Sequence, residues 1–65
     1  MKWVDVLDIA IELSEKHPDV DPRAINFVDL RNYVCGLEDF DDDPEHSGER
    51  ILEAIQLAWM EEKES

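Results

Sequence analysis

The densest group of side chains able to do chemistry is a run of carboxylates in the middle of the chain. Six of the eight residues from 38 to 45 are Asp or Glu, and the other two are Phe40 and Pro44. Carboxylate oxygens bind hard divalent cations, and carboxylates also pair with basic side chains of other proteins. The run therefore indicates a metal site or a surface that docks on a cationic partner.

A calcium loop of the EF-hand type is the first metal site to test. Asp39, Asp41 and Asp43 occupy the first three ligand positions of such a loop. The match then fails, because the sixth position, which needs Gly for a sharp turn, is Pro44, and the twelfth, which needs a bidentate Glu, is Arg50. What remains is a cluster of surface carboxylates. Such a cluster predicts weak, exchangeable binding of a hard divalent cation such as Fe²⁺, Mn²⁺, Mg²⁺ or Ca²⁺, and no tightly held cofactor.

Side chains with other chemistry form no constellation in the sequence. His17 and His46 are isolated, which favours a helix end for the first and a solvated loop for the second. Cys35 is the single cysteine, and in so negative a molecule we expect its thiol pKa to be raised, which suppresses the reactive thiolate. Ser47 is explained as a helix cap. Because a chain of 65 residues rarely encloses a pocket for acid–base work, we do not expect an enzyme.

Composition limits the class of partner. The chain has 18 Asp and Glu against 6 Lys and Arg, which gives a formal net charge of -12 at pH 7. This potential repels nucleic acid and anionic lipid, attracts basic protein surfaces and metal cations, and disfavours self-association, so we expect a monomer. No apolar run reaches the roughly 20 residues of a membrane span. With no leader-like segment and a single cysteine, we expect a protein of the reducing cytoplasm.

The first predicted helix carries a second group of acids. Apolar residues recur with a helical period up to Pro18, which ends the helix, and Leu7 and Ile11 are expected to widen the buried face. The acids of this helix fall within an arc of about 80°. They are Asp5, Asp8, Glu12 and Glu15. Asp5 is also the predicted N-cap. The helix is therefore expected to bury one side and to present a carboxylate stripe on another.

The middle of the chain permits two interpretations. In the first, Pro22 opens a single helical turn capped by Asp21, and in the second, residues 23 to 28 form a short extended piece. A second, shorter helix follows, with Asp29 as the predicted N-cap and Gly36 at its C-terminal end.

The third predicted helix is the most regular. Ser47 is the predicted N-cap, and a contiguous apolar face of about 160° follows, formed by Ile51, Leu52, Ala54, Ile55, Ala58 and Trp59. Phe40 is expected to hold the acidic run against this core. We therefore predict a mainly α fold, with residues 1–65 forming one small three-helix domain of the helix-turn-helix type.

Acidic runs are usually solvated segments, but two features favour an ordered docking surface here. Phe40 and Pro44 interrupt the run, and a separate acid stripe is predicted on the first helix. An ordered negative surface suits docking on a basic protein, with an association rate that is sensitive to salt. We expect replacement of Asp41, Asp42 and Asp43 by Asn to leave folding nearly intact, because exposed like charges add little stability.

Several segments are familiar when taken together. "LEDFDDDP" at residues 37–44, "SGERILEAI" at residues 47–55 and Trp59 resemble the IscX family of small acidic accessory proteins in iron–sulfur cluster assembly. The resemblance covers nearly the whole chain, with further similar segments at "KW", "HPDVDP" and "FVDL". Two positions depart from it, because Gly48 stands where the family commonly has Asn and Val28 where it commonly has Thr.

The resemblance implies a modified winged-helix fold and a role in the bacterial cytoplasm. It implies docking on a basic surface of the cysteine desulfurase IscS, where bacterial frataxin also docks, with effects on sulfur delivery to the scaffold IscU. It also implies weak binding of ferrous iron. The motif residues that match are Glu38, Asp39, Asp41, Asp42 and Asp43. The helical-wheel argument adds to the docking surface Asp5, Asp8, Glu12 and Glu15. The alternative is an iron donor whose main role is delivery of Fe²⁺.

Overall fold

The chain folds into three α-helices and one short 3₁₀ helix. The computed structural model describes residues 1–64, with α1 at Val6–Lys16, α2 at Phe27–Cys35, η1 at Pro44–His46 and α3 at Glu49–Glu64. No strand occurs within residues 1–64. The prediction of a mainly α, three-helix domain is thereby confirmed. Its winged-helix part is not confirmed, because the described residues form no β-hairpin.

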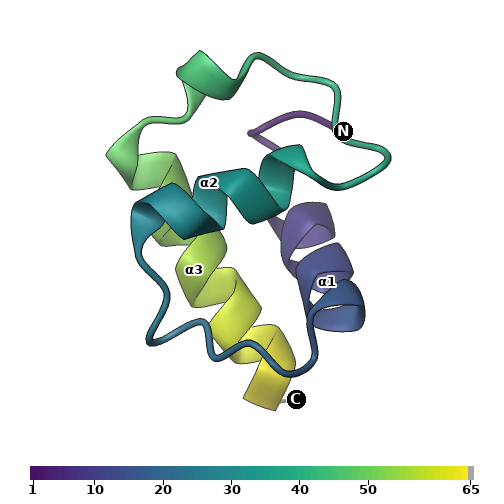
Figure 1. The fold of residues 1–65 in the computed structure, drawn as a ribbon, viewed down its shortest axis with the longest axis vertical. Coiled ribbons are helices and arrows are strands. Elements are labelled where there is room, and N and C mark those ends of the chain that lie inside the picture. Colours follow the sequence, from purple (N-terminus) through teal and green to yellow (C-terminus); the bar gives the residue numbers. More distant parts are fainter. Residues whose placement is uncertain (65) are drawn as a thin grey trace.

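The core lies where the three helices meet. Figure 1 shows α1 and α3 beside each other, with α2 lying across them and the loop after α2 forming one edge of the molecule. Each helix contributes apolar side chains that are buried, and segments outside the helices add Trp3 and Leu37. The helical members are Ile9, Ala10, Leu13, Leu30, Val34, Leu52, Ile55, Ala58 and Trp59. The apolar face predicted for α3 is thus confirmed as part of the core.

The buried face of α1 is narrower than predicted. Leu7 and Ile11 are 66% and 40% exposed, so the prediction that they widen the core face is wrong. On an ideal helix they lie about 120° and 160° from the centre of the buried stripe, which is too far for contact with α3 or α2. Asp5 precedes the helix as predicted, but its carboxylate accepts a hydrogen bond from the backbone N–H of Lys2 at 2.8 Å instead of from α1.

The first residues of α2 and α3 differ from the predicted caps. Asn26 caps α2, because its side chain accepts from the N–H of Asp29 at 2.8 Å, so Asp29 lies in the first turn and the N-cap prediction was wrong. At α3, the carbonyl of Gly48 accepts the first helical hydrogen bond. The Ser47 hydroxyl instead donates to the carbonyl of Pro44 at 2.9 Å, so Ser47 does not cap α3 and that prediction was wrong.

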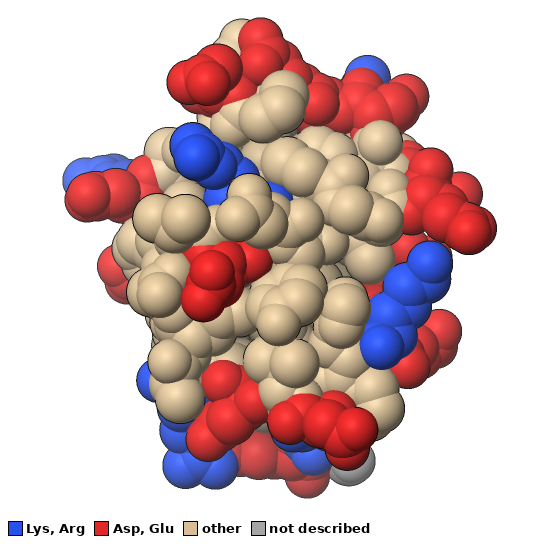
Figure 2. Space-filling model, viewed as in Figure 1, with Lys and Arg blue, Asp and Glu red and all other residues tan. Residues whose placement is uncertain are grey.

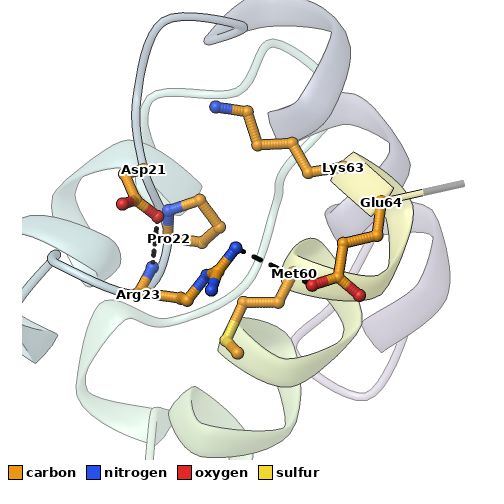
Figure 3. Close-up of a pocket in the computed structure, with 6 residues that line it drawn as sticks. All are labelled: Asp21, Pro22, Arg23, Met60, Lys63 and Glu64. Atoms are coloured by element: carbon orange, nitrogen blue, oxygen red, sulfur yellow. Dashed lines mark hydrogen bonds and ion pairs between the residues drawn. The ribbon is translucent and has the colours of Figure 1, made fainter.

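The segment between α1 and α2 is fixed to the C-terminal end of α3. Residues 22–24 form a turn in which the Asp21 carboxylate accepts from the N–H of Arg23 at 3.0 Å, which supports the turn and not the extended piece. Figure 3 shows the Arg23 guanidinium directed toward the Glu64 carboxylate across a small hollow. The two groups lie 3.8 Å apart. Lys63 donates to a backbone carbonyl of the same segment at 2.7 Å. Arg23 and Lys63 thus link this segment to the end of α3, but the exposed Arg23–Glu64 pair contributes little stability.

Candidate functional site

The acidic run, residues 38–45 and called the acidic loop below, is held in place by Trp3. The Trp3 side chain is 1% exposed, and its ring meets Phe40 edge-on with centroids 4.7 Å apart. Its indole Nε1–H donates to the carbonyl of Asp43 at 2.8 Å. The prediction that Phe40 packs on the core is confirmed. The role of Trp3 was missed, although a Trp beside the first helix is a side chain whose buried N–H needs an acceptor.

Two carboxylates of the loop shape its backbone. Asp42 accepts from the N–H of Trp3 at 3.1 Å and from the N–H of Asp43 at 2.7 Å. The hydrogen bond from Trp3, and to a smaller extent that from Asp43, holds the pKa of Asp42 below its usual value. Asp43 caps η1, because its side chain accepts from the N–H of Glu45 at 2.9 Å. The His46 ring nitrogens lie 3.6 Å and 3.7 Å from these two carboxylates.

Asp41 ties the loop to the first two residues. Its Oδ1 lies 3.1 Å from the terminal ammonium of Met1 and 3.5 Å from Nζ of Lys2. The hydrogen bond from that ammonium, followed by the charge of Lys2, holds the pKa of Asp41 below its usual value. Backbone contacts reinforce the pairing, since the Asp41 N–H donates to the Met1 carbonyl at 3.0 Å and the Met1 ammonium donates to the Asp39 carbonyl.

These contacts alter the expectation for the triple Asn variant. Its premise was that exposed carboxylates add little to folding, whereas Asp42 uses both of its oxygens as acceptors for backbone N–H groups. An Asn side chain has a single acceptor oxygen and presents an NH₂ group at the other position. Asp41, Asp42 and Asp43 thus hold the acidic loop together, and their replacement by Asn is expected to loosen it.

Four of the other predicted site acids gather in a groove between α1 and the acidic loop. The groove has a volume of about 520 Å³ and is lined by three carboxylates of α1, one of the loop and two apolar side chains: Asp8, Glu12, Glu15, Asp39, Met1 and Ile11. Four predicted site residues, from two separate segments, thus meet at one hollow. Glu38 is exposed but does not line it, and Asp5 is turned toward Lys2 instead.

The groove is a place of concentrated negative charge. Figure 2 shows acidic side chains along the edge of the molecule over the acidic loop and α1, whereas Lys and Arg side chains are dispersed. Four carboxylates at one hollow attract cationic groups and favour Arg or Lys side chains, which donate several charge-assisted hydrogen bonds. The groove is therefore suited to a basic protein surface.

A preformed metal centre is not found within residues 1–64. No three side chains of His, Cys, Asp or Glu among them are placed to hold one ion. The loop carboxylates that the motif predicted as iron ligands are divided, because Asp39 lines the groove while Asp41, Asp42 and Asp43 accept hydrogen bonds or pair with cations. An ion bound here would keep much of its water shell, which is typical of weak, exchangeable binding.

Cys35 and His17 both pack on neighbouring side chains. Cys35 is half-buried against the core, and this burial raises the pKa of its thiol despite the charge of Arg31. His17 packs on the Tyr33 ring, with centroids 4.5 Å apart.

Among residues 1–64, no helix is long and apolar enough to cross a membrane.

Known proteins resemble this chain along its length. The sequence matches the family described as iron-sulphur cluster assembly over residues 1–64. An uncharacterized protein of Pseudomonas aeruginosa is 61% identical over 64 residues, which cover 98% of this chain and 97% of that protein. The matched range includes the core, the acidic loop and the groove. The chain therefore belongs to the iron–sulphur cluster assembly family.

Proposed function

We propose that this protein is a non-catalytic accessory protein of iron–sulfur cluster assembly that docks through its acidic groove on a basic surface of cysteine desulfurase. The convergence of α1 and loop carboxylates at one groove, in a chain of net charge -12, is the observation that carries this proposal. Membership of the assembly family supplies the context. Docking at a surface that the scaffold IscU approaches and that bacterial frataxin also uses would modulate sulfur transfer.

The contacts of the acids support two separate roles, one in holding the acidic loop and one in binding a partner. Asp41, Asp42 and Asp43 hold the acidic loop to the N-terminal segment. Asp39 and the α1 acids at the groove remain available to a partner, together with the exposed Glu38. Because complementary charge raises the association rate and orients the encounter, the groove acids are expected to control how fast the complex forms.

Association kinetics with purified cysteine desulfurase test the proposal. The double variant Glu12→Gln, Asp39→Asn removes two groove charges, and Glu53→Gln, Glu61→Gln removes two exposed charges from α3 as a matched control. We expect the groove variant to associate several-fold more slowly at low salt and the control to behave like the parent. Equal association rates for both variants would show that the groove is not the docking surface. Circular dichroism confirms that each variant is folded.

Weak binding of ferrous iron is the second part of the proposal, and the four carboxylates at the groove support it. Exposed carboxylates without soft ligands bind hard cations with little selectivity, which suits an exchangeable ion better than a donor that carries iron. An anaerobic Fe²⁺ titration followed by amide NMR is expected to shift residues around Asp39 and Glu12 in fast exchange. A donor role would instead require iron-loaded protein to accelerate cluster formation on IscU beyond free Fe²⁺.

We further propose that the protein is a monomer and that it is located in the cytoplasm.

A further inference from the structure

Three large apolar side chains lie exposed on α1 and on the turn that precedes it. Val4, Leu7 and Ile11 are 76%, 66% and 40% exposed. Leu7 and Ile11 are four residues apart on α1 and therefore share one side of it. Val4 lies in the turn before α1 and lines a shallow hollow together with Leu7, and the three side chains are called the apolar stripe below. Single exposed apolar residues are ordinary on protein surfaces, whereas contiguous ones that are bordered by polar groups are typical of interaction sites. Their exposure in a domain with so small a core therefore calls for a partner.

The apolar stripe is continuous with the acidic groove. Val4 and Leu7 line a shallow hollow together with Asp8, and Ile11 lines the groove, where Asp8 is also present. On an ideal helix Leu7 and Ile11 lie about 40° apart, and Asp8 and Glu15 lie within about 60° of Ile11. The surface thus has apolar side chains next to a row of carboxylates, an arrangement like the apolar centre and polar rim of protein interfaces.

Charge decides which occupant fits this surface. A second copy of the chain would bring another net charge of -12 against the same carboxylates, and anionic lipid would be repelled in the same way. A protein surface with apolar side chains between Lys or Arg residues matches both the stripe and its border. We propose that the apolar stripe is the centre of the interface with the cysteine desulfurase and sets the lifetime of that complex. This inference rests on the proposed function, because it takes the same partner.

The two parts of the surface act at different ranges. Charges attract over about a Debye length, ~8 Å at physiological salt, so the groove acids act before contact and set the association rate. Apolar side chains act only when water has been excluded, so the stripe acts after contact and sets the dissociation rate. With two-thirds of the Leu7 side chain available for burial, its loss is expected to speed dissociation about tenfold, equivalent to about 1.4 kcal/mol.

The test compares Leu7→Gln and Ile11→Gln with Leu57→Gln. Leu57 is 51% exposed on α3 and lines neither hollow, so it undergoes the same chemical change outside the proposed interface. Gln and Leu have similar helix propensity, which keeps the fold intact. Binding to immobilised desulfurase is followed in real time at low and at moderate salt. We expect faster dissociation for the two stripe variants at both salt concentrations, with association rates and their salt dependence like those of the parent and of Leu57→Gln.

The possible outcomes separate this inference from the proposed function. Parent-like dissociation of both stripe variants, with normal binding by the parent, would overturn the stripe's role and leave the acidic groove as the docking surface. Failure of the parent to bind desulfurase at any salt would overturn both. Sedimentation of the free protein and flotation with neutral lipid vesicles supply two further outcomes. A dimer, or vesicle binding, that is abolished by Leu7→Gln would assign the stripe to another occupant and refute the inference.

Discussion

The two tryptophans offer a matched comparison of one hydrogen bond. Trp3 and Trp59 are 1% and 0% exposed, so both rings are buried alike. The Nε1–H of Trp3 donates to the Asp43 carbonyl at 2.8 Å, whereas that of Trp59 is buried without a partner among the described residues. Replacing either Trp by Phe removes a similar apolar volume. Trp3→Phe also removes an indole N–H that donates a hydrogen bond, whereas Trp59→Phe removes an indole N–H that has no acceptor among the described residues. The pair of variants therefore isolates the link between Trp3 and the acidic loop.

Removal of the indole N–H is expected to destabilise the fold at Trp3 and to stabilise it at Trp59. Loss of packing is expected to cost about 1–2 kcal/mol in either variant. Trp3→Phe loses in addition a hydrogen bond that contributes about 1 kcal/mol, while Trp59→Phe removes an unpaired buried donor whose desolvation costs about 1–3 kcal/mol. Trp3→Phe should thus be about 2–3 kcal/mol less stable than the parent, and Trp59→Phe nearly as stable. In a domain with a total stability of about 3–10 kcal/mol, the first loss is large.

Urea and thermal unfolding monitored by circular dichroism measure this difference. At 4–8 °C per kcal/mol for a domain of this size, we expect Trp3→Phe to melt roughly 8–24 °C below Trp59→Phe. The urea m-values should agree, since both native states bury a similar surface. Each variant retains one Trp, so fluorescence reports on the remaining site. Equal melting temperatures, or a larger loss for Trp59→Phe, would refute the assignment of the Trp3 hydrogen bond as a stabilising link.

Three further expectations concern the carboxylates. Acidification below about pH 4 should release the acidic loop, because Asp41 and Asp42 have lowered pKa values in the folded state, so the stability they contribute is present above the usual Asp pKa and is lost as the pH falls through the lowered values. The NMR signal of the Trp3 indole N–H should report this, and its persistence through the whole acid range would contradict it. Asp42→Asn should speed amide hydrogen exchange at Trp3 and Asp43 more than Asp39→Asn does, since Asp42 uses both oxygens as acceptors; similar exchange in the two variants would argue against this role. Added NaCl should raise the melting temperature while slowing association with the desulfurase, because it screens self-repulsion and steering alike, and a melting temperature that fell with salt would show that self-repulsion is not the main electrostatic influence on stability.

The helices were predictable because their hydrophobic period is strong, but their ends and faces were not. At the start of α2, Asn26 and Asp29 are both good N-cap residues three positions apart, and only the observed hydrogen bond tells the cap from the first-turn acid. On α1, the period located the buried side but not its width. That width depends on how many helices cover α1, which is a property of the assembled fold. Leu7 and Ile11 were misassigned for this reason.

The charge of the acidic loop was visible in the sequence, but the division of its carboxylates was not. Asp42 and Asp43 are fixed by Trp3, which lies 40 positions from Asp43 in the chain. No local pattern reports a contact over that separation, so neighbouring Asp residues of equal charge were assigned a single role. A charge-removal series across the loop would therefore mix two effects, since changes at Asp41, Asp42 or Asp43 loosen the loop that carries Asp39. Only variants within the groove, with the loop intact, measure how much the charge contributes to docking.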